Sequence, residues 1–312
     1  MSYDPSKPYK KSILEIIQET WDTPYLSVQK GLYPVFKRKF SFPEVDHTDG
    51  IGSKGIYHWR ARTFQNAVQD ALAMNLNDLA LVRAVPYKLQ NHLILPEDNP
   101  NVVLQIIQCL AQECKKHNIA ITGGETSIQT EEPGMELSIT MSGFIKEPEE
   151  NKLQAGDLLF GIQSSGLHSN GFTKVRELFR EETRKEFTVP TRVYAYDILS
   201  LSERISIHGM MHITGGAFTK LKDVLGNDAD VFVKRNAQLQ PQEIFQEIYQ
   251  RGVSDEEMYK TFNCGIGFVF SVSPEDAKNI PAQFRAFPIG EVIKGRGQIT
   301  IESAFSNCYT FL

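Results

Sequence analysis

Hydrophobic residues in the first half of the chain follow two different spacings. Between Phe64 and Leu76 they recur three and four positions apart, which predicts a helix with one buried face. A second helix is predicted from Pro100 to Cys114, where Asn99 or the neighbouring Asp98 can cap the first turn. Residues 137–145 instead alternate between apolar and polar, which predicts a strand with one buried face. These spacings indicate a mixed α/β fold.

The second half repeats one order of elements. An apolar run at 158–162 predicts a buried strand, and a glycine-rich loop at 164–171 and a helical pattern follow it. The same order recurs from 207 to 225, and a further helix is expected from Pro241. Three more strands are expected at 267–272, 288–293 and 298–301.

A charged break at 147–151 separates the two halves. We therefore expect a two-domain α/β (α+β) protein. Its predicted parts are an N-terminal arm at 1–40, an N-terminal domain at 41–150 and a C-terminal domain at 151–312.

Composition narrows the classes of function. The net charge of −5 gives no general basic field, so we expect no nucleic-acid partner, and we interpret the basic cluster at 30–39 as a solvated face. Neither a targeting segment nor a membrane span is evident, which favours a cytoplasmic protein. The four cysteines contain no Cys-x-x-Cys pair and are interpreted as reduced thiols without a metal.

Four loops combine glycine with hydroxyl and acidic residues, at 47–54, 123–126, 164–171 and 212–216. Glycine lets backbone N–H groups approach an anion, and a following helix start adds partial positive charge. Four such loops predict a cleft for several phosphate groups, as a nucleotide and a phosphorylated substrate would require.

Carboxylates in or beside these segments suggest a metal. Asp49, Asp78 and Glu125 can hold Mg²⁺ together with substrate phosphates, or they can cap helices and satisfy loop amides. His168 can contact a phosphate or move a proton, or it can have a structural role bonded to the backbone.

Three familiar motifs are excluded by their context. The string Gly50-x-Gly52-x-x-Gly55 lacks the apolar strand before it that a dinucleotide site needs. Lys54 lacks the preceding glycine of a phosphate-binding Walker loop. The pair His208 and His212 has the spacing of a zinc site, but Gly209 stands where the metalloprotease pattern needs glutamate.

Together the loops resemble those of aminoimidazole ribonucleotide synthetase, the phosphoribosylformylglycinamidine cyclo-ligase of purine biosynthesis. The resemblance spans about residues 45 to 300. It is carried by the segments Thr48-Asp49-Gly50-Ile51-Gly52-Ser53-Lys54, Gly123-Gly124-Glu125-Thr126, 164–171, 190–194, 212–216 and 258–267, of which the last is the most specific.

The resemblance implies a homodimer whose N-terminal domains pair through a β-barrel at the interface. It also implies the reaction, in which ATP phosphorylates the formamide oxygen of formylglycinamidine ribonucleotide. An amidine nitrogen then closes the imidazole ring as phosphate leaves. ATP and Mg²⁺ are the implied cofactors, and the implied partner is a small-molecule substrate without nucleic acid or membrane.

Site residues follow from the same resemblance. Catalytic roles fall on His168, Asp49 and Lys54, and metal binding on Asp49, Asp78 and Glu125. The nucleotide is expected at Asp49, Gly50, Gly52, Lys54, Asn77, Asp78, Gly123, Gly124 and Glu125. The substrate is expected at Ser164, Ser165, His168, Ser169, Asn170, Thr214 and Gly215.

The chain departs from the family pattern at three places. Arg83 replaces a glycine, Asn91 stands where the family usually has aspartate, and the arm lacks a glycine-rich stretch, for which Lys7 or Lys10 is a candidate substitute. Two alternatives therefore stay open. One is a sister ATP-dependent enzyme resembling thiamine-phosphate kinase, and the other is a dimeric paralogue that binds nucleotide without catalysis.

Overall fold

In the computed structural model, which describes residues 7–312, the chain divides into two units. The first comprises residues 7–79 and 83–147, and the second comprises 80–82 and 148–312. Within residues 7–312 we find no helix whose length and hydropathy would let it cross a bilayer.

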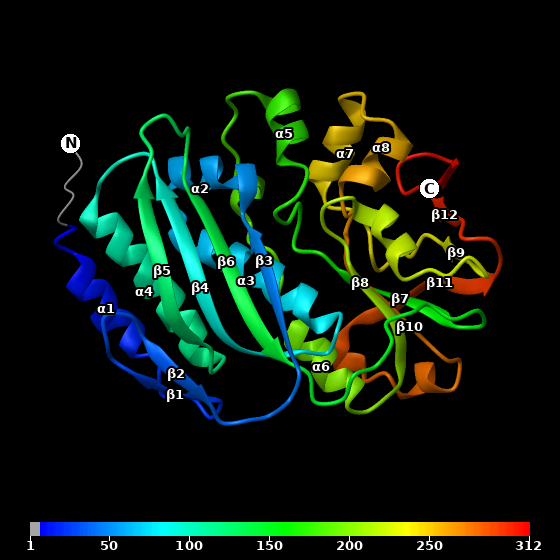
Figure 1. The fold of residues 1–312 in the computed structure, drawn as a ribbon. Coiled ribbons are helices and arrows are strands. Elements are labelled where there is room, and N and C mark those ends of the chain that lie inside the picture. Colours follow the sequence, from blue (N-terminus) through cyan, green and yellow to red (C-terminus); the bar gives the residue numbers. More distant parts are fainter. Residues whose placement is uncertain (1–6) are drawn as a thin grey trace. The chain divides into compact units, whose positions relative to one another are not determined.

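The first unit is built on a four-stranded sheet in the order β3-β6-β4-β5 (Figure 1). Only β4 and β5 run parallel in it, and the other neighbours are antiparallel. Its elements are α1 (Lys10–Gln18), β1 (Leu26–Gln29), β2 (Val35–Arg38), β3 (Glu44–Gly50), η1 (Gly52–Lys54), α2 (Gly55–Ala61), α3 (Phe64–Ala80), β4 (Val85–Leu95), α4 (Pro100–Lys116), β5 (Ala120–Ile128) and β6 (Glu136–Phe144).

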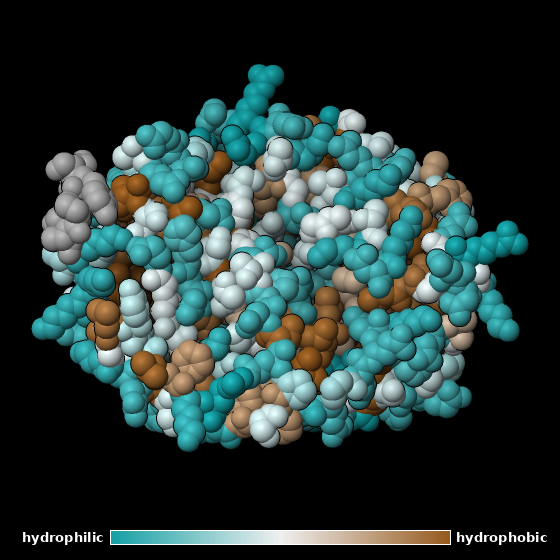
Figure 2. Space-filling view, in the orientation of Figure 1, coloured by the Kyte–Doolittle hydropathy of each residue, from teal (hydrophilic) through white to brown (hydrophobic). Residues whose placement is uncertain are grey.

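The two faces of this sheet differ in polarity. Leu89, Leu93 and Ile139 point to the face behind which α3 and α4 lie in Figure 1, and all three are fully buried. The opposite face is open and carries Thr48, Gln90 and other polar residues, and the surface over it is mostly white and teal in Figure 2. In each strand, therefore, the residues that alternate toward the open face are mostly polar.

Several predicted elements of this unit are confirmed and others need correction. The helices predicted around 64–76 and 100–114 are α3 and α4, and Asn99 caps α4 by accepting from the Val102 N–H. The 123–126 segment, predicted as a loop, lies inside β5. Residues 48–50, also predicted as loop, end β3. Asn77 and Asp78 lie within α3, which continues to Ala80.

The second unit contains a seven-stranded sheet in the order β13-β12-β9-β11-β7-β10-β8. Its strands are β7 (Leu158–Gln163), β8 (Ile207–His212), β9 (Ala229–Val233), β10 (Ile266–Val272), β11 (Ala286–Lys294), β12 (Ile299–Glu302) and β13 (Tyr309–Phe311). All neighbours are antiparallel except β12 and β9.

Short helices connect these strands (Figure 1). They are α5 (Phe172–Phe179), η2 (Lys185–Thr188), α6 (Ala195–Ser202), η3 (Ala217–Asp223), α7 (Glu243–Gln250), α8 (Asp255–Thr261), η4 (Asp276–Asn279) and η5 (Ala282–Phe284). The helix predicted after Gly216 is a 3₁₀ helix rather than an α-helix. The order of strand, loop and helix predicted from residue 158 onward is confirmed at β7 and α5.

Candidate functional site

In the first unit, polar side chains gather where β3 packs against α3. The His47 ring lies 3.4 Å from Asp78 Oδ2 through Nε2 and 3.0 Å from Asn75 Oδ1 through Nδ1. The Asn75 amide also donates to the Asp49 carbonyl oxygen at 3.2 Å. Contact with Asp78, helped by Asn75 and by the charge of Asp49, raises the pKa of His47 above its usual value. Asp49 and Asp78 thus share one histidine neighbour.

A third carboxylate lies near Asp49. Glu136, on β6, accepts from the Gly52 N–H at 3.4 Å and from the Ser138 hydroxyl at 3.2 Å. Burial, together with the negative charge of Asp49, raises the pKa of Glu136. The Gly50 N–H donates to Asp49 Oδ1 at 2.7 Å, so carboxylates already accept from two backbone donors of the 50–54 segment.

Glu125 lies apart from this cluster. Asp49 and Glu125 are on the two edge strands, about 14 Å apart at the usual strand spacing. Asp49 also pairs with the buried Ile139 on the covered face, whereas Glu125 pairs with the exposed His92 on the open face. The three carboxylates expected to bind one metal are therefore not assembled within a single chain. Residues 7–312 contain no group of three potential metal ligands.

Lys7 is the partner of Glu125. Its ammonium lies 2.5 Å from Glu125 Oε1 and 2.7 Å from the Thr126 carbonyl oxygen, and this contact lowers the pKa of Glu125. Of the two lysines considered as substitutes for the glycine-rich arm, Lys7 therefore contacts the 123–126 segment.

Lys54 is fully buried rather than exposed on a loop. Its ammonium lies 2.8 Å from Asp70 Oδ2, and His58 Nε2 lies 2.7 Å from the same oxygen. Burial alone would raise the pKa of Asp70, but Lys54 and His58 together hold it well below its usual range. Burial lowers the pKa of Lys54 and of His58. The structure thus places Lys54 in an internal ion pair beneath the 50–54 segment.

Gly124 lets β5 lie close to β4. A side chain at Gly124 would stand 2.5 Å from Asn91 Oδ1 and 2.8 Å from the Asn91 carbonyl oxygen. Asn91 is buried at this contact, on the same face as Asp49. Gly124 therefore serves strand packing in this chain, whereas a side chain at Gly123 would meet only the Gln90 amide, at 3.4 Å.

In the second unit, Asn170 joins three segments that are distant in sequence. Its side-chain amide donates to the Thr214 carbonyl at 2.7 Å and to the Thr261 carbonyl at 2.5 Å. Lys220 reaches the Thr214 hydroxyl at 3.1 Å, and Gly215 beside it is exposed. The loops expected to bind substrate at 164–171 and 212–216 are thus brought together, with the 258–267 segment beside them.

His168 lies beneath the loop, not at its surface. The residue is fully buried in a left-handed conformation, with φ at 61°. Its Nε2 accepts from the Ser165 N–H at 3.3 Å and lies 3.4 Å from the Tyr194 hydroxyl. A side chain at Gly267 would stand 2.0 Å from that hydroxyl, so the absence of one leaves room for both rings. The alternative in which His168 is bonded to the backbone is the one that this geometry supports.

The loop's serines have protein partners of their own. Ser165 donates to the Pro190 carbonyl at 2.6 Å, and Ser169 lies 3.3 Å from the Thr191 hydroxyl. Ser164 is buried, and its carbonyl accepts from Gln242 at 2.7 Å. Ser165 and Ser169 remain partly exposed, and with Asn170 and Gly215 they are the members of the expected substrate set that reach the surface.

Sequence reasoning missed four residues that organise these sites. His47 and Asn75 hold the Asp49 cluster, Asp70 pairs with Lys54, and Asn263 donates to the Gly166 carbonyl at 2.8 Å. Asp70 and Asn75 are buried polar residues of α3, and the spacing of apolar residues that predicts this helix gives no signal for them. Asn263 lies in the most specific matching segment.

Comparisons with known proteins show which family the chain resembles. A model of the N-terminal domain of AIR synthase related proteins matches residues 44–145, and a model of their C-terminal domain matches 154–302. Phosphoribosylformylglycinamidine cyclo-ligase of Saccharolobus solfataricus is 34% identical over 95% of this chain and 92% of its own length. The chain belongs to the AIR synthase related family. The cyclo-ligase of Methanococcus vannielii is 35% identical over 78% of this chain and 76% of its own length.

Solved structures show the same fold at lower identity. The hydrogenase maturation protein HypE in complex with ATP superposes with a TM-score of 0.70 at 17% identity, covering 97% of this chain and 93% of that one. A thiamine-monophosphate kinase from Stenotrophomonas maltophilia gives a TM-score of 0.64 at 16% identity, covering 94% and 96%. At these identities the likeness establishes the fold alone.

Proposed function

We propose that this protein is an ATP-dependent cyclo-ligase that converts formylglycinamidine ribonucleotide to aminoimidazole ribonucleotide. The observation that carries the proposal is 34% identity over nearly the whole chain to a relative of that name. The fold neighbours add no competing assignment, because the thiamine-monophosphate kinase is only 16% identical.

The reaction requires activation of a poor leaving group. The formamide oxygen attacks the γ-phosphorus of ATP, and ADP leaves. An amidine nitrogen then attacks the activated carbon, and the oxygen departs with the phosphate. Enzymes of this kind act by holding the reacting atoms close and by stabilising the charge that develops.

Asp49 and Asp78 fit a Mg²⁺ ion that is completed by phosphate oxygens. Mg²⁺ in nucleotide sites is held by one or two carboxylates, with waters and phosphates supplying the rest. Asp49 and Asp78 supply two carboxylates beside His47, and residues 7–312 contain no group of three protein ligands, which matches that requirement. When bound, the ion would neutralise phosphate charge, while Asn75 fixes the end of β3 that carries Asp49.

In the second unit, Ser165, Ser169, Asn170 and Gly215 offer polar groups to the phosphorylated substrate. We assign His168 to positioning, because it accepts from the backbone of the same loop and is fully buried. Lys54 likewise positions the segment after β3 through Asp70.

Catalysis by this chain is compatible with its departures from the family pattern. Arg83 has a φ of 55°, the conformation that glycine favours, so the backbone path expected for the family's glycine is kept. We further propose a cytoplasmic homodimer whose N-terminal domains pair through a β-barrel, as the family resemblance implies. We place the contact on the open face of the four-stranded sheet.

The test measures phosphate release from Mg²⁺-ATP with and without formylglycinamidine ribonucleotide, together with formation of the aminoimidazole product. Substrate-dependent release with product is expected. ATP binding without turnover on this substrate would contradict the proposal.

Asp49→Asn tests the metal-binding assignment within that assay. Removing a carboxylate that would hold the phosphate-neutralising Mg²⁺ should lower kcat/KM by roughly 100-fold or more. Asn keeps an oxygen that can accept from the Gly50 N–H, so folding should be retained, which thermal unfolding can check. Glu131→Gln removes the same charge at an exposed site and serves as the control. Equal activity of the two variants would remove Asp49 from the site.

A further inference from the structure

The His47 ring lies beside the two aspartates proposed to hold Mg²⁺, and no step of the proposed reaction uses it. His47 and Asp49 are two residues apart on β3, so both side chains point to the covered face of the sheet. Asp78 approaches from α3. Of the His47 side chain 31% is exposed, and of the Asp78 side chain 12%. The ring is therefore within reach of an ion that enters from solvent.

The Asn75 side chain decides which ring nitrogen of His47 carries a proton. The Asn75 amide nitrogen donates to the carbonyl oxygens of Asp49 and Ala71, at 3.2 and 2.9 Å. The atom that faces His47 Nδ1, at 3.0 Å, is therefore Asn75 Oδ1, and an amide oxygen can only accept. Nδ1 consequently donates, and the lone pair of the neutral ring lies on Nε2.

The spacing between that lone pair and Asp78 suits a shared ion better than a direct hydrogen bond. His47 Nε2 is 3.4 Å from Asp78 Oδ2, whereas charge-assisted hydrogen bonds are typically about 2.7–2.9 Å long. The contact of His208 with Asp157 has that length, 2.9 Å. Two ligand atoms about 2.1 Å from one ion, at an angle of about 90–109°, lie roughly 3.0–3.4 Å apart. His47 and Asp78 thus have the separation of two ligands of one metal ion.

Asn75 gives His47 the support that histidine metal ligands usually have. Such histidines donate the other ring N–H to a carboxylate or carbonyl oxygen, which fixes the orientation of the ring. Asn75 is fully buried on α3, three residues before Asp78, so one face of one helix holds both the ring and the carboxylate. The negative charge of Asp49 acts on the same ring. The pair is therefore fixed in place before an ion arrives.

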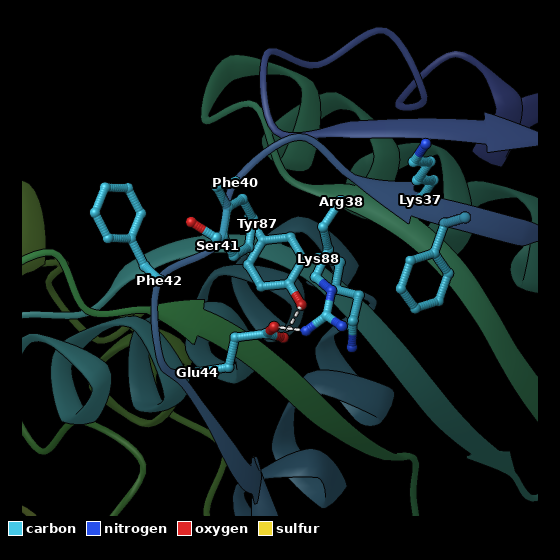
Figure 3. Close-up of a pocket in the computed structure, with 9 residues that line it drawn as sticks. Lys37, Arg38, Phe40, Ser41, Phe42, Glu44, Tyr87 and Lys88 are labelled. Carbon is cyan, nitrogen blue, oxygen red and sulfur yellow. Dashed lines mark hydrogen bonds and ion pairs between the residues drawn. The ribbon is translucent and has the colours of Figure 1, made fainter.

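A carboxylate at the other end of β3 has a different kind of partner. Arg38 and Tyr87 converge there on the Glu44 carboxylate, as Figure 3 shows. Arginine keeps its proton in proteins, so this carboxylate is paired with a permanent cation. Asp78 instead faces the imidazole of His47, which can bind a metal ion once it is neutral.

A nitrogen ligand changes which ion such a site favours. Mg²⁺ takes oxygen ligands and loses its water reluctantly. Imidazole suits first-row transition ions, and an octahedral site rich in carboxylate, phosphate and water oxygens suits Mn²⁺ among them.

We propose that His47 Nε2 binds the same metal ion as Asp78, and that this nitrogen makes the site select Mn²⁺ over Mg²⁺. The inference rests on the proposed function, because it concerns the ion that accompanies the nucleotide.

The experiment is pulsed electron paramagnetic resonance of the full chain loaded with Mn²⁺ and pyrophosphate, which supplies phosphate oxygens and contains no nitrogen. A coupling between Mn²⁺ and ¹⁴N is expected in the parent, and it should disappear in His47→Gln. Labelling the parent with ¹⁵N-histidine should replace this signal by a ¹⁵N coupling, so the readout does not depend on the folding of a variant. His208→Gln removes a histidine beside another aspartate, and this matched control should keep the coupling.

Competition between Mn²⁺ and Mg²⁺ measures the selectivity of the site. His47→Gln should lower the affinity for Mn²⁺ at least about tenfold and the affinity for Mg²⁺ less than about threefold. Thermal unfolding shows whether each variant is folded.

Three results would overturn the proposal: no binding of Mn²⁺, a bound Mn²⁺ without histidine coupling in the parent, or equal losses of affinity for the two ions in a folded His47→Gln chain. None of these readouts requires turnover. An ion bound through oxygen alone would leave the proposed cyclo-ligase activity intact, and the phosphate-release assay tests that activity separately.

Discussion

Arg83 holds a left-handed backbone conformation with φ at 55°, which is costly for a residue with a Cβ atom by roughly 1–2 kcal/mol. Arg83→Gly should therefore give a chain about 1 kcal/mol more stable than Arg83→Ala, since both lose the side chain and only alanine keeps the strain. Urea unfolding of the two variants measures the difference. Equal stabilities, or a more stable alanine variant, would contradict this explanation.

Gly267 tests the packing beneath the substrate loop. A methyl group there would stand 2.0 Å from the Tyr194 hydroxyl and 2.6 Å from His168 Cε1, so Gly267→Ala should destabilise the protein by about 1–3 kcal/mol. Gly215→Ala is the matched control, because its nearest contact is Asn170 Oδ1 at 3.8 Å. Thermal or urea unfolding that shows equal losses would rule out the crowding argument.

At the scale of single residues, the segments that carry the site residues could be predicted from the sequence, but the side chains that bind those residues could not. Lys54 stands in a glycine-rich motif, and nothing local reveals that Asp70, sixteen residues later on a helix, neutralises it. The position of His168 depends on Tyr194 and Gly267, which belong to other elements. Side-chain direction in a loop is decided by such distant contacts. The sequence alone therefore could not distinguish a catalytic from a structural role of His168.

At the scale of elements, strongly periodic segments were predictable and half-exposed strands were not. Apolar residues at helical spacing predict α3 and α4, and both helices are confirmed. β3 reads Glu-Val-Asp-His-Thr-Asp-Gly and lacks the apolar alternation of a typical strand, because its open face is polar and its other face carries the Asp49 cluster. β5 contains Gly123 and Gly124, which indicate a loop locally but fit a strand that lies close to Asn91.

Helix α7 is tied to the segment after α5 by ion pairs that should depend on pH. Hydrogen bonds from Arg184 and Arg251 lower the pKa of Glu247. A lowered carboxyl pKa contributes stability above the unfolded pKa, and that stability is lost as pH falls through the folded value. Glu247→Gln should therefore be less stable than the parent at pH 7, by at most about 1 kcal/mol at this partly exposed site.

The difference should vanish in acid, because a protonated glutamate resembles glutamine. Thermal unfolding from pH 7 down to pH 3 measures this trend. Glu256→Gln, which removes an exposed pair with Lys260 alone, should show a smaller change across the same range. A Glu247→Gln penalty that persists unchanged at pH 3 would contradict the ionic explanation.

At the scale of the whole molecule, family membership came from the order of several motifs rather than from any one of them. The hydrogen bonds of Asn170 show why that order carries information. One side chain joins Thr214 and Thr261, so segments far apart in sequence are constrained together. The surface of the proposed subunit contact could not be predicted from sequence motifs, because the open sheet face carries ordinary polar residues that alternate as in any strand.

The proposed homodimer makes a prediction about that face. Thr48 and Thr140 lie on it with their hydroxyl oxygens 2.9 Å apart, and both residues are exposed in the single chain. Thr140→Arg adds bulk and charge where a second sheet would close, so the mass in solution should fall from twice 35.3 kDa to 35.3 kDa without unfolding. Light scattering after size-exclusion chromatography measures the mass, and circular dichroism checks the fold.

Thr300→Arg, on a partly exposed position of β12, should remain dimeric. A parent chain of single mass, or a Thr140→Arg chain that stays dimeric, would place the subunit contact elsewhere or remove it.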